Sequence, residues 1–263
     1  MLAEARHPAV PTYPDLAGKV AVVTGGSRGI GAATCLALAD NGVRVAVCAR
    51  NQAGIDAVVD ELRGQGADAI GISADVSHAE RITRLRERVE VELGPADILI
   101  PFAGGFSSYT PVNEISEAEW RHVIDLNLTS TFLTVREFLP GMIERRRGAI
   151  VTMSSNSGRV LDILLTASYA AAKAAVIQFT RHAAKELGLY GIRVNCIAPA
   201  TTLSERVADI ISDELRHRVI ELCPLGRLGT PEDSALATLF LASESASWLT
   251  GVTIDVAGGR VMM

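Results

Sequence analysis

Short apolar runs rich in β-branched residues alternate with longer helical patterns along almost the whole chain. The expected strands are residues 19–24, 43–48, 67–73, 96–102, 149–153, 192–197 and 252–256. The expected helices are residues 29–41, 51–64, 77–93, 116–145, 167–189 and 231–242. Strands without alternating polar residues are typical of a parallel sheet that helices cover on both faces. The sequence therefore predicts an α/β fold with a doubly wound, parallel seven-stranded sheet.

The chain of 263 residues shows no internal repeat or linker that would divide it. Residues 16–263 are therefore expected to form a single domain. Residues 1–15 contain three prolines and no apolar signal core, which predicts a flexible N-terminal tail. Residues 200–229 depart from the alternation and have a helical pattern near 203–222. We expect them to form a lid over the active site, and a purely structural insertion is the alternative.

Charge and cysteine content restrict the classes of partner. The net charge of −5 gives no basic footprint for nucleic acid or an anionic membrane surface. No apolar run reaches the ~18 residues that span a bilayer, so a cytoplasmic protein is expected. The four cysteines lack CxxC spacing and the five histidines are scattered. Isolated thiols in a reducing compartment are favoured over disulfides or a metal site, and no metal is expected.

A glycine-rich turn follows the first expected strand directly. Residues 24–31 read TGGSRGIG and lead into the next helix. Glycines allow the backbone to turn tightly and to approach a pyrophosphate, which the amino terminus of the helix also attracts. A glycine cluster alone could serve any strand-to-helix turn. Its place at the first βα turn favours dinucleotide binding.

The end of the second expected strand indicates which dinucleotide binds. An acidic residue there usually binds the ribose 2′-hydroxyl of NAD. This chain has no acid in residues 47–51, whereas Arg50 and Arg28 could hold a 2′-phosphate. The sequence therefore predicts NADP (NADPH), with NAD the less favoured cofactor. The alternative is that both arginines are merely solvated.

Tyr169 and Lys173 are four residues apart and fall on one face of an expected helix. A free tyrosine has a pKa of ~10, and a nearby ammonium group favours the phenolate and lowers that pKa. This pair is therefore suited to proton transfer at neutral pH. The YxxxK spacing alone is common by chance.

Several motifs in a fixed order now make a resemblance clear. From Leu16 onwards the chain resembles the short-chain dehydrogenase/reductase family. The family's TGxxxGxG motif matches residues 24–31, and its YxxxK motif matches Tyr169 and Lys173. Its active-site serine matches Ser155 and its active-site asparagine matches Asn127. Residues 224–233, 240–243 and 249–251 resemble the 3-oxoacyl-(acyl-carrier-protein) reductase-like branch.

The resemblance implies a Rossmann fold and an NAD(P)-dependent oxidoreductase that transfers a hydride between nicotinamide and a carbonyl or alcohol. Ketone or 3-oxoacyl reduction with NADPH is expected. Tyr169 would transfer the proton, and Lys173 would lower the Tyr169 pKa and bind the nicotinamide ribose. Ser155 would hydrogen-bond the carbonyl oxygen. Asn127 would hold a water that links Lys173 to solvent.

The expected cofactor site combines the glycine turn, the arginines and segments implied by the resemblance. The resemblance assigns residues 75–76 to adenine and residues 197–204 to the carboxamide and pyrophosphate. It also implies a homotetramer that pairs through residues 116–145 and 167–189. The expected cofactor-binding residues are Gly25, Ser27, Arg28, Gly29, Ile30, Gly31, Arg50, Asp75, Val76, Ala103, Gly104, Tyr169, Lys173, Pro199, Thr202 and Ser204.

Two departures from the family pattern stand out. Pro101 and Phe102 replace the usual Asn-Asn pair, and proline lacks the N–H that a central strand would donate. We expect altered sheet pairing there without loss of activity. Ala200 replaces a glycine, and Ser204 replaces a threonine while keeping its hydroxyl.

The substrate is expected to be a small carbonyl or acyl compound, because residues 105–112 and 161–166 would make an apolar pocket. Some of these side chains could pack on a neighbouring subunit instead. Two alternatives to the enzyme stay open. One is an inactive nucleotide-binding regulatory or scaffolding protein, which the intact motifs disfavour. The other is an epimerase-like enzyme, for whose longer substrate domain the chain has no room. The apolar side chains expected in the pocket are Phe106, Tyr109, Leu161, Ile163, Leu164 and Leu165.

Overall fold

A single parallel sheet organises the protein. The computed structural model describes residues 9–106, 109–161, 165–208 and 211–262. Within them, seven strands follow the order β3-β2-β1-β4-β5-β6-β7, which confirms the predicted doubly wound sheet. The strands are β1 (Val20–Thr24), β2 (Arg44–Ala49), β3 (Ala69–Ser73), β4 (Ile98–Pro101), β5 (Gly148–Met153), β6 (Ile192–Pro199) and β7 (Thr253–Val256).

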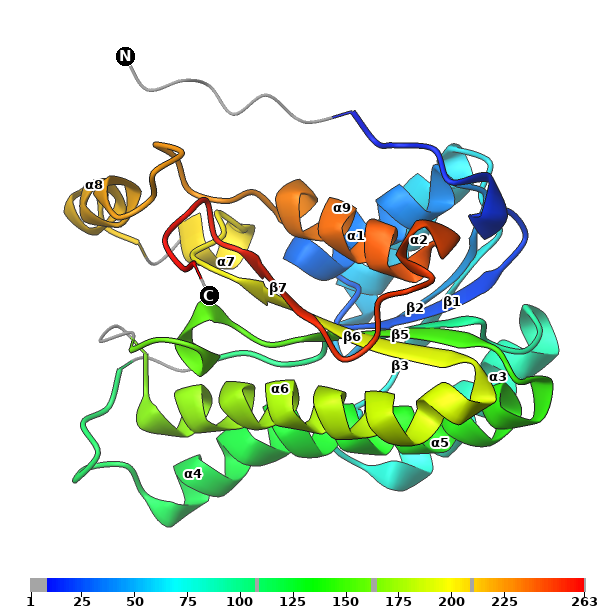
Figure 1. Ribbon diagram of the computed structural model, residues 1–263, viewed down its shortest axis with the longest axis horizontal. Helices are drawn as coiled ribbons and strands as arrows, with labels where there is room; N and C mark the ends of the chain where they lie inside the picture. The colour runs from blue at the N-terminus through cyan, green and yellow to red at the C-terminus, as the bar shows by residue number, and fades with distance from the viewer. Residues whose placement is uncertain (1–8, 107–108, 162–164, 209–210, 263) are drawn as a thin grey trace.

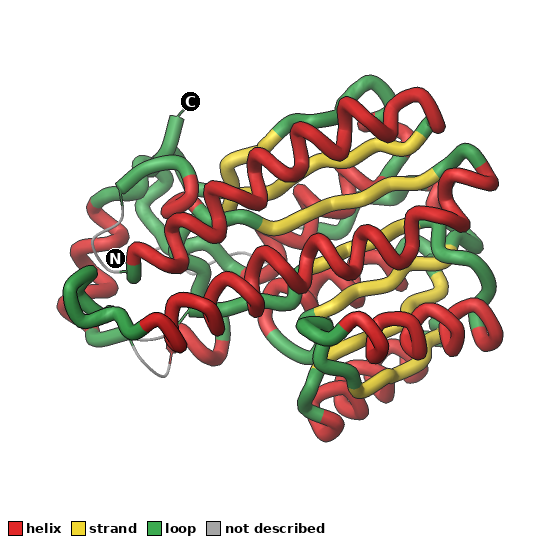
Figure 2. The backbone as a smooth tube through the Cα atoms, turned by 90° about the horizontal axis from the view of Figure 1, so that it is seen from below, coloured by secondary structure: helices red, strands yellow, loops and turns green. Residues whose placement is uncertain are grey.

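Helices cover both faces of this sheet (Figure 1). One layer consists of α1 (Gly29–Ala39), α2 (Gln52–Gly64) and α9 (Pro231–Ala242). The opposite layer consists of α3 (Ala79–Glu92), α4 (Glu117–Ile124), α5 (Ser130–Arg145) and α6 (Ala167–Leu187), of which α5 and α6 run side by side (Figure 2). The short helices α7 (Glu205–Ala208) and α8 (Asp213–Glu221) lie at one end of the molecule. In the described part of the chain, no helix is both long and apolar enough to cross a membrane.

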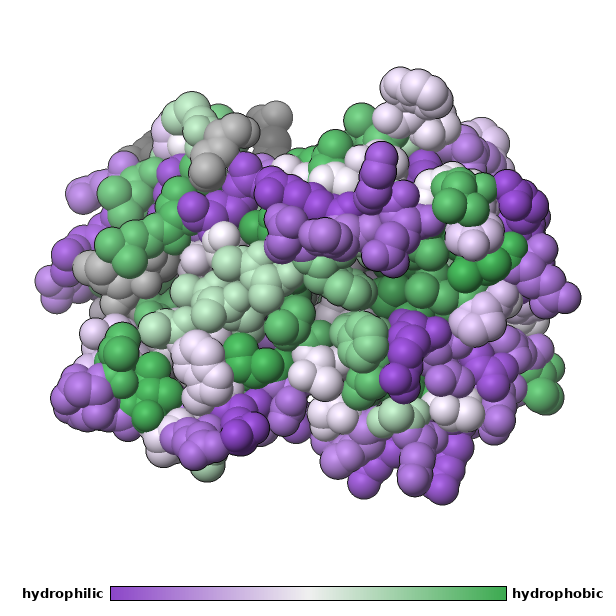
Figure 3. Space-filling model, turned by 60° about the horizontal axis from the view of Figure 1, so that its bottom comes forward, coloured by the Kyte–Doolittle hydropathy of each residue, from purple (hydrophilic) through white to green (hydrophobic). Residues whose placement is uncertain are grey.

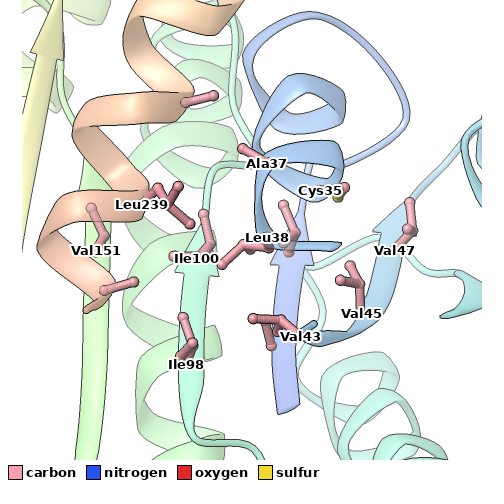
Figure 4. Packing of buried hydrophobic residues seen from close by; sticks show 14 of the residues in the cluster. Cys35, Ala37, Leu38, Val43, Val45, Val47, Ile98, Ile100, Val151 and Leu239 are labelled. Carbon is pink, nitrogen blue, oxygen red and sulfur yellow. The ribbon is translucent and has the colours of Figure 1, made fainter. Parts of the chain in front are cut away.

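Strand β2 shows why the apolar runs lack alternation. Val45 and Val47 pack into the cluster under α1 and α9, while Ala46 and Cys48 pack into the cluster on the opposite face. Successive side chains point to opposite faces, and both faces are covered, so every position is apolar. Figure 4 shows the first cluster, where Leu38 and Leu239 meet the strands.

The segment expected as one helix over residues 116–145 contains a π-helical turn at Asp125–Thr129 between α4 and α5. Within this turn the Asn127 Nδ2 donates to the carbonyl oxygen of Val123 at 2.9 Å. A regular α-helix gives that carbonyl to a backbone N–H, so the side chain competes with the helical hydrogen bond. The segment is thus helical as predicted, but the prediction of one long helix missed the π-helical turn at Asn127, an expected site residue.

Pairing between β4 and β5 is short, as expected from Pro101. The register pairs Ile98 with Ala149 and Leu99 with Ile150, whereas β4 pairs with β1 up to Pro101. The Phe102 N–H donates to the Thr24 oxygen of β1 at 3.2 Å. Alternate residues of a strand point their N–H groups to opposite sides, so the missing N–H of Pro101 faces β5.

The segment expected as a loose tail differs from that expectation in its described part. The Tyr13 N–H donates to Asn41 Oδ1 at 2.6 Å, and Asn41 Nδ2 donates to the Pro11 oxygen at 3.1 Å. Asp15 accepts the N–H of Glu244 at 3.0 Å. Residues 11–15 are thus held against the ends of α1 and α9, and residues 1–8 lie outside the described residues.

A glycine in β3 lets α2 pack closely on the sheet. A Cβ added at Gly71 would overlap Ile55 Cγ2 and lie 3.2 Å from Val59 Cγ2. We expect Gly71→Ala to lower the free energy of unfolding by about 1–3 kcal/mol, because overpacking forces α2 outward. Urea unfolding measures this change.

Gly64→Ala is the matched control, because an added Cβ there would meet no described atom within 4 Å. It should leave the stability unchanged or raise it by about 0.5–1 kcal/mol, since alanine is the better helix former. Equal destabilisation by the two variants would contradict the close-packing explanation.

Candidate active site

The site lies where the order of the strands reverses. Strands β1 and β4 are neighbours, and the chain builds the sheet outward from them in both directions. Ligands of open α/β sheets bind at the carboxyl ends of the strands at such a point. A cleft of about 690 Å³ opens there beside a smaller apolar pocket of about 280 Å³. Ile30, Phe106, Met153, Tyr169 and Ser204 line both cavities and thus mark their junction.

The glycine turn forms one wall of the cleft. Gly25 has a φ of +71°, and a Cβ there would lie 2.8 Å from the Phe102 oxygen. A Cβ at Gly31 would overlap the carbonyl oxygen of Gly25. These positions need glycine for conformation and for space. The turn leads into α1, whose N-cap residue Arg28 makes no side-chain capping hydrogen bond, and such a helix amino terminus is suited to bind phosphate.

Cationic and small side chains line the far end of the cleft. Arg28, Arg50 and Ala49 all face it, and no acid stands at the end of β2. Asp75 lies opposite and accepts hydrogen bonds from the Ser77 N–H and hydroxyl at 3.1 and 2.6 Å. Although burial acts to raise it, these bonds and the charge of Arg50 hold the pKa of Asp75 below its ordinary value. The positive charge of Arg50 therefore reaches Asp75 across this end of the cleft.

Helix α6 supplies the tyrosine and lysine side chains. Thr166 caps the helix by accepting the Tyr169 N–H at 3.3 Å. The Lys173 Nζ lies 5.5 Å from the centroid of the Tyr169 ring and donates to the Met153 oxygen at 3.0 Å. Burial lowers the pKa of Lys173 from 10.5 to about 8. The ammonium group thus lies beside the phenol, as the four-residue spacing predicts.

Ser155 follows β5 and lines the apolar pocket beside Tyr169. Its hydroxyl accepts hydrogen bonds from the Ser157 hydroxyl at 3.1 Å and from the Ser157 N–H at 3.3 Å, and it donates to Asn156 Oδ1 at 3.2 Å. Ser154 has a different role, because its hydroxyl donates to the backbone oxygen of Lys173 at 2.7 Å. The contacts of Ser154 thus join the serine segment to the turn of α6 that carries Lys173.

Asn127 lies behind the cleft rather than in its lining. Its Oδ1 accepts the Gly105 N–H at 3.0 Å, and its Nδ2 donates to the Gly105 oxygen at 2.9 Å. A Cβ added at Gly104 would lie 2.7 Å from Asn127 Oδ1 and 3.4 Å from Lys173 Nζ. The asparagine therefore fastens the loop after β4 close to the lysine.

The structure brings most of the expected cofactor residues together. All sixteen line the cleft except Pro199 and Thr202, which line the apolar pocket instead. Sequence reasoning missed Met153 as the acceptor for Lys173 and Glu205 on the lid side. No pattern in the sequence pointed to either residue.

The expected substrate-pocket residues divide into two groups. Phe106 and Leu165 line the apolar pocket, and the Phe106 ring packs edge-on against Tyr169 with centroids 5.8 Å apart. Tyr109 and Leu161 are exposed instead. Ile163 and Leu164 lie outside the described residues.

The segment expected as a lid contributes further apolar side chains to the pocket. Its two ends are joined, because the Leu203 N–H donates to the Gly229 oxygen at 2.8 Å and the Gly229 N–H donates to the Thr201 oxygen at 3.2 Å. The larger apolar side chains that line the pocket from this segment are Val207, Ile211, Leu215 and Val219.

Comparison with known sequences agrees with this geometry. Residues 19–215 match the family described as short chain dehydrogenase. The chain is 40% identical over 248 residues to the 3-oxoacyl-(acyl-carrier-protein) reductase FabG of Staphylococcus aureus, covering 93% of this chain and 98% of that protein. It is 39% identical over 262 residues to the cyclohexanol dehydrogenase of a Rhodococcus species, covering 93% of this chain and 96% of that protein.

Solved structures lead to the same family. A crystal structure of 3-oxoacyl-(acyl-carrier protein) reductase from Brucella melitensis has a TM-score of 0.91 at 37% identity, covering 95% of this chain and 94% of that one. Another from the same organism, with bound NAD, has a TM-score of 0.89 at 36% identity and the same coverage. The chain therefore belongs to the short-chain dehydrogenase/reductase family, in its 3-oxoacyl reductase-like branch, and is an oxidoreductase acting on carbonyl or alcohol groups.

Proposed function

We propose that this protein uses NADPH to reduce the carbonyl group of an apolar ketone or 3-oxoacyl substrate. One observation carries the proposal. Tyr169 lies at the junction of the cleft and the apolar pocket, with Lys173 on the cleft side and Ser155 on the pocket side. A carbonyl carbon bound in the pocket can thus face the cleft while its oxygen faces two hydroxyl groups.

The cleft fits a nicotinamide dinucleotide phosphate. Gly25 and Gly31 leave room for a close backbone approach, and the amino end of α1 suits the pyrophosphate. Arg28 and Arg50 suit a 2′-phosphate because guanidinium groups bind phosphate in a bidentate manner. When bound, the cofactor would supply the hydride for the carbonyl carbon.

The side chains supply the proton and stabilise developing charge. As the carbonyl carbon gains a hydride, its oxygen gains an electron pair and takes the proton of the Tyr169 hydroxyl. Ser155 donates a hydrogen bond to that oxygen. The charge of Lys173 favours the phenolate left behind. Because burial places the pKa of Lys173 at about 8, this group can also pass protons near neutral pH.

The pocket supports an uncharged apolar substrate. Its described lining residues carry no acidic or basic side chain. Two of the similar proteins are named for a 3-oxoacyl group and for cyclohexanol, which agrees with an acyl or alicyclic ketone. Residues 200–229 act as the lid in this proposal, because they supply four of the apolar walls. The inactive regulatory alternative gains no support, since every proposed catalytic side chain is present.

We further infer that copies of the chain assemble through α5 and α6. Figure 3 shows apolar surface gathered on the face to which these helices belong. Phe132 of α5 is 42% exposed, and its ring packs edge-on against Phe179 of α6 with centroids 6.3 Å apart. Ala167, Ala171 and Ala174 are exposed along α6, so a second helix can approach it closely. We expect a homotetramer, or at least a dimer, to form by such pairing.

Tyr169→Phe tests the proposed proton transfer. This change keeps the ring and removes the hydroxyl, so kcat for the best substrate should fall by roughly 10³- to 10⁴-fold. Substrates come from a panel of 3-oxoacyl thioesters and alicyclic ketones, followed at the nicotinamide absorbance. NADPH affinity by calorimetry should be unchanged, and Tyr190→Phe at the far end of the α6 segment is the control. Near wild-type kcat in Tyr169→Phe would refute the mechanism.

Ala49→Asp tests the cofactor assignment. A carboxylate beside Arg50 would repel the 2′-phosphate, and like charges at an interface cost several kcal/mol. The ratio of kcat/KM with NADPH to kcat/KM with NADH should therefore fall at least about tenfold. Gln65→Asp adds the same charge at the other end of α2 and should leave this ratio unchanged. A wild-type enzyme that uses both cofactors equally well would contradict the proposed preference.

Lys173→Met tests the energetic cost of the buried ammonium. The pKa of Lys173 is about 8 in the folded protein and 10.5 as a reference for the unfolded chain. The unfolded chain therefore binds more protons between these values, and stability rises with pH across that window. The cost is complete below pH 8, so the variant should gain up to about 3 kcal/mol of stability at pH 7.

The gain in Lys173→Met should shrink as the pH rises from 8 towards 10.5, while reductase activity is lost at every pH. Urea unfolding across this range measures the first effect. A variant that is less stable than the wild type at pH 7 would show that the hydrogen bond to Met153 outweighs the cost of burying the charge.

A further inference from the structure

A buried ion pair lies next to the serine segment and outside both cavities. Arg159 Nε is 3.1 Å from Asp255 Oδ1, and both side chains are only 11% exposed. Neither atom has a hydrogen-bond partner among the described residues, so the two charged atoms face only each other. Removing one partner of such a pair leaves an uncompensated buried charge, which the structure relieves only by moving.

Arg159 is joined directly to the turn that presents Ser155. The 3₁₀ turn Asn156–Gly158 begins after Ser155, whose Oγ caps it by accepting the Ser157 N–H at 3.3 Å. The Arg159 N–H closes the same turn by donating to the Asn156 oxygen at 2.9 Å. A shift of Arg159 is therefore transmitted to the serine hydroxyl within one turn of the backbone.

The turn is held from two sides. On one side it presses on α6, since a Cβ added at Gly158 would lie 2.7 Å from the backbone carbon of Lys173. On the other side lies Asp255 of β7. This strand is fixed to β6, where Asp255 pairs with Ala198, and the Ala200 N–H donates to the Val256 oxygen at 3.0 Å. The turn therefore lies between the α6 backbone and the ion pair with β7.

We propose that Asp255, acting through Arg159, is a positioning residue that aims the Ser155 hydroxyl at the substrate oxygen. This inference rests on the proposed function, because it needs Ser155 to donate to that oxygen. Neither Asp255 nor Arg159 touches the cavities. In this proposal their effect on the reaction passes through Ser155.

The test measures Asp255→Asn in two backgrounds, with the full-length enzyme, NADPH and the best ketone of the panel. In the wild-type background kcat should fall about tenfold, because misplacing a catalytic group by a fraction of an ångström weakens its bond to the transition state. In the Ser155→Ala background the same change should cost less than about twofold, since no hydroxyl is left to misplace. NADPH affinity should be unchanged in both.

Asp97→Asn is the matched control for a loss of stability alone. Asp97 is also a buried carboxylate paired with an arginine, Arg147 at 2.8 Å, and it lies just before the amino end of β4, away from the reaction. It should reduce the free energy of unfolding without changing kcat. If Asp255→Asn does not fold, Arg159→Lys replaces it, because this variant keeps the charge while shortening its reach. It should show a smaller loss that also disappears in the Ser155→Ala background.

The outcomes separate this inference from the proposed function. An equal loss of kcat in both backgrounds, or wild-type kcat in Asp255→Asn, would overturn the positioning role and leave the function intact. Wild-type kcat in Ser155→Ala itself would count against the proposed chemistry, and the positioning role would fall with it.

Discussion

A buried ammonium group joins the sheet to α6 at the centre of the site. Lys173 Nζ bonds the Met153 oxygen at the end of β5, and the backbone oxygen of Lys173 accepts the Ser154 hydroxyl. The same residue is thus fixed to the strand end at both its side chain and its backbone. Burial lowers the pKa of Lys173 to about 8 and costs stability at neutral pH. The fold tolerates that cost because the charge is placed beside Tyr169, where the proposed reaction uses it.

The remaining parts of the site are arranged around this group by loops rather than by regular elements. Asn127 leaves the α-helical pattern to bond both backbone groups of Gly105, which brings the loop after β4 next to Lys173. Gly158 has no side chain, so the serine turn lies directly on the α6 backbone. Asn127 departs from its helix in its hydrogen bonds, and Gly158 departs from an ordinary turn residue in having no side chain. Such local departures are expected where a site must be preorganised.

Sequence reasoning succeeded where the determining contacts are local. The spacing of Tyr169 and Lys173 places both on one helical face, and the glycines of residues 24–31 are required by the turn that they form. Resemblance added Ser155 and Asn127 as site residues, which spacing alone does not single out. The π-helical turn escaped prediction because Asn127 bonds both the Val123 oxygen of its own helix and Gly105 of a distant loop. The ion pair between Arg159 and Asp255 escaped for the same reason, since residues distant in sequence meet only after the sheet has formed.

The early end of the ladder between β4 and β5 explains why the Met153 oxygen is available to Lys173. In a regular parallel ladder, with Leu99 opposite Ile150, the residue-101 N–H would bond the Val151 oxygen and the residue-103 N–H would bond the Met153 oxygen. Proline has no N–H to give, and the Ala103 N–H donates to the Thr24 hydroxyl at 3.1 Å instead. The ladder therefore ends early on this side of β5. The Met153 carbonyl, left without a strand partner, is satisfied by the ammonium group, so a break in the sheet becomes the anchor for the charge on which the proposed chemistry depends.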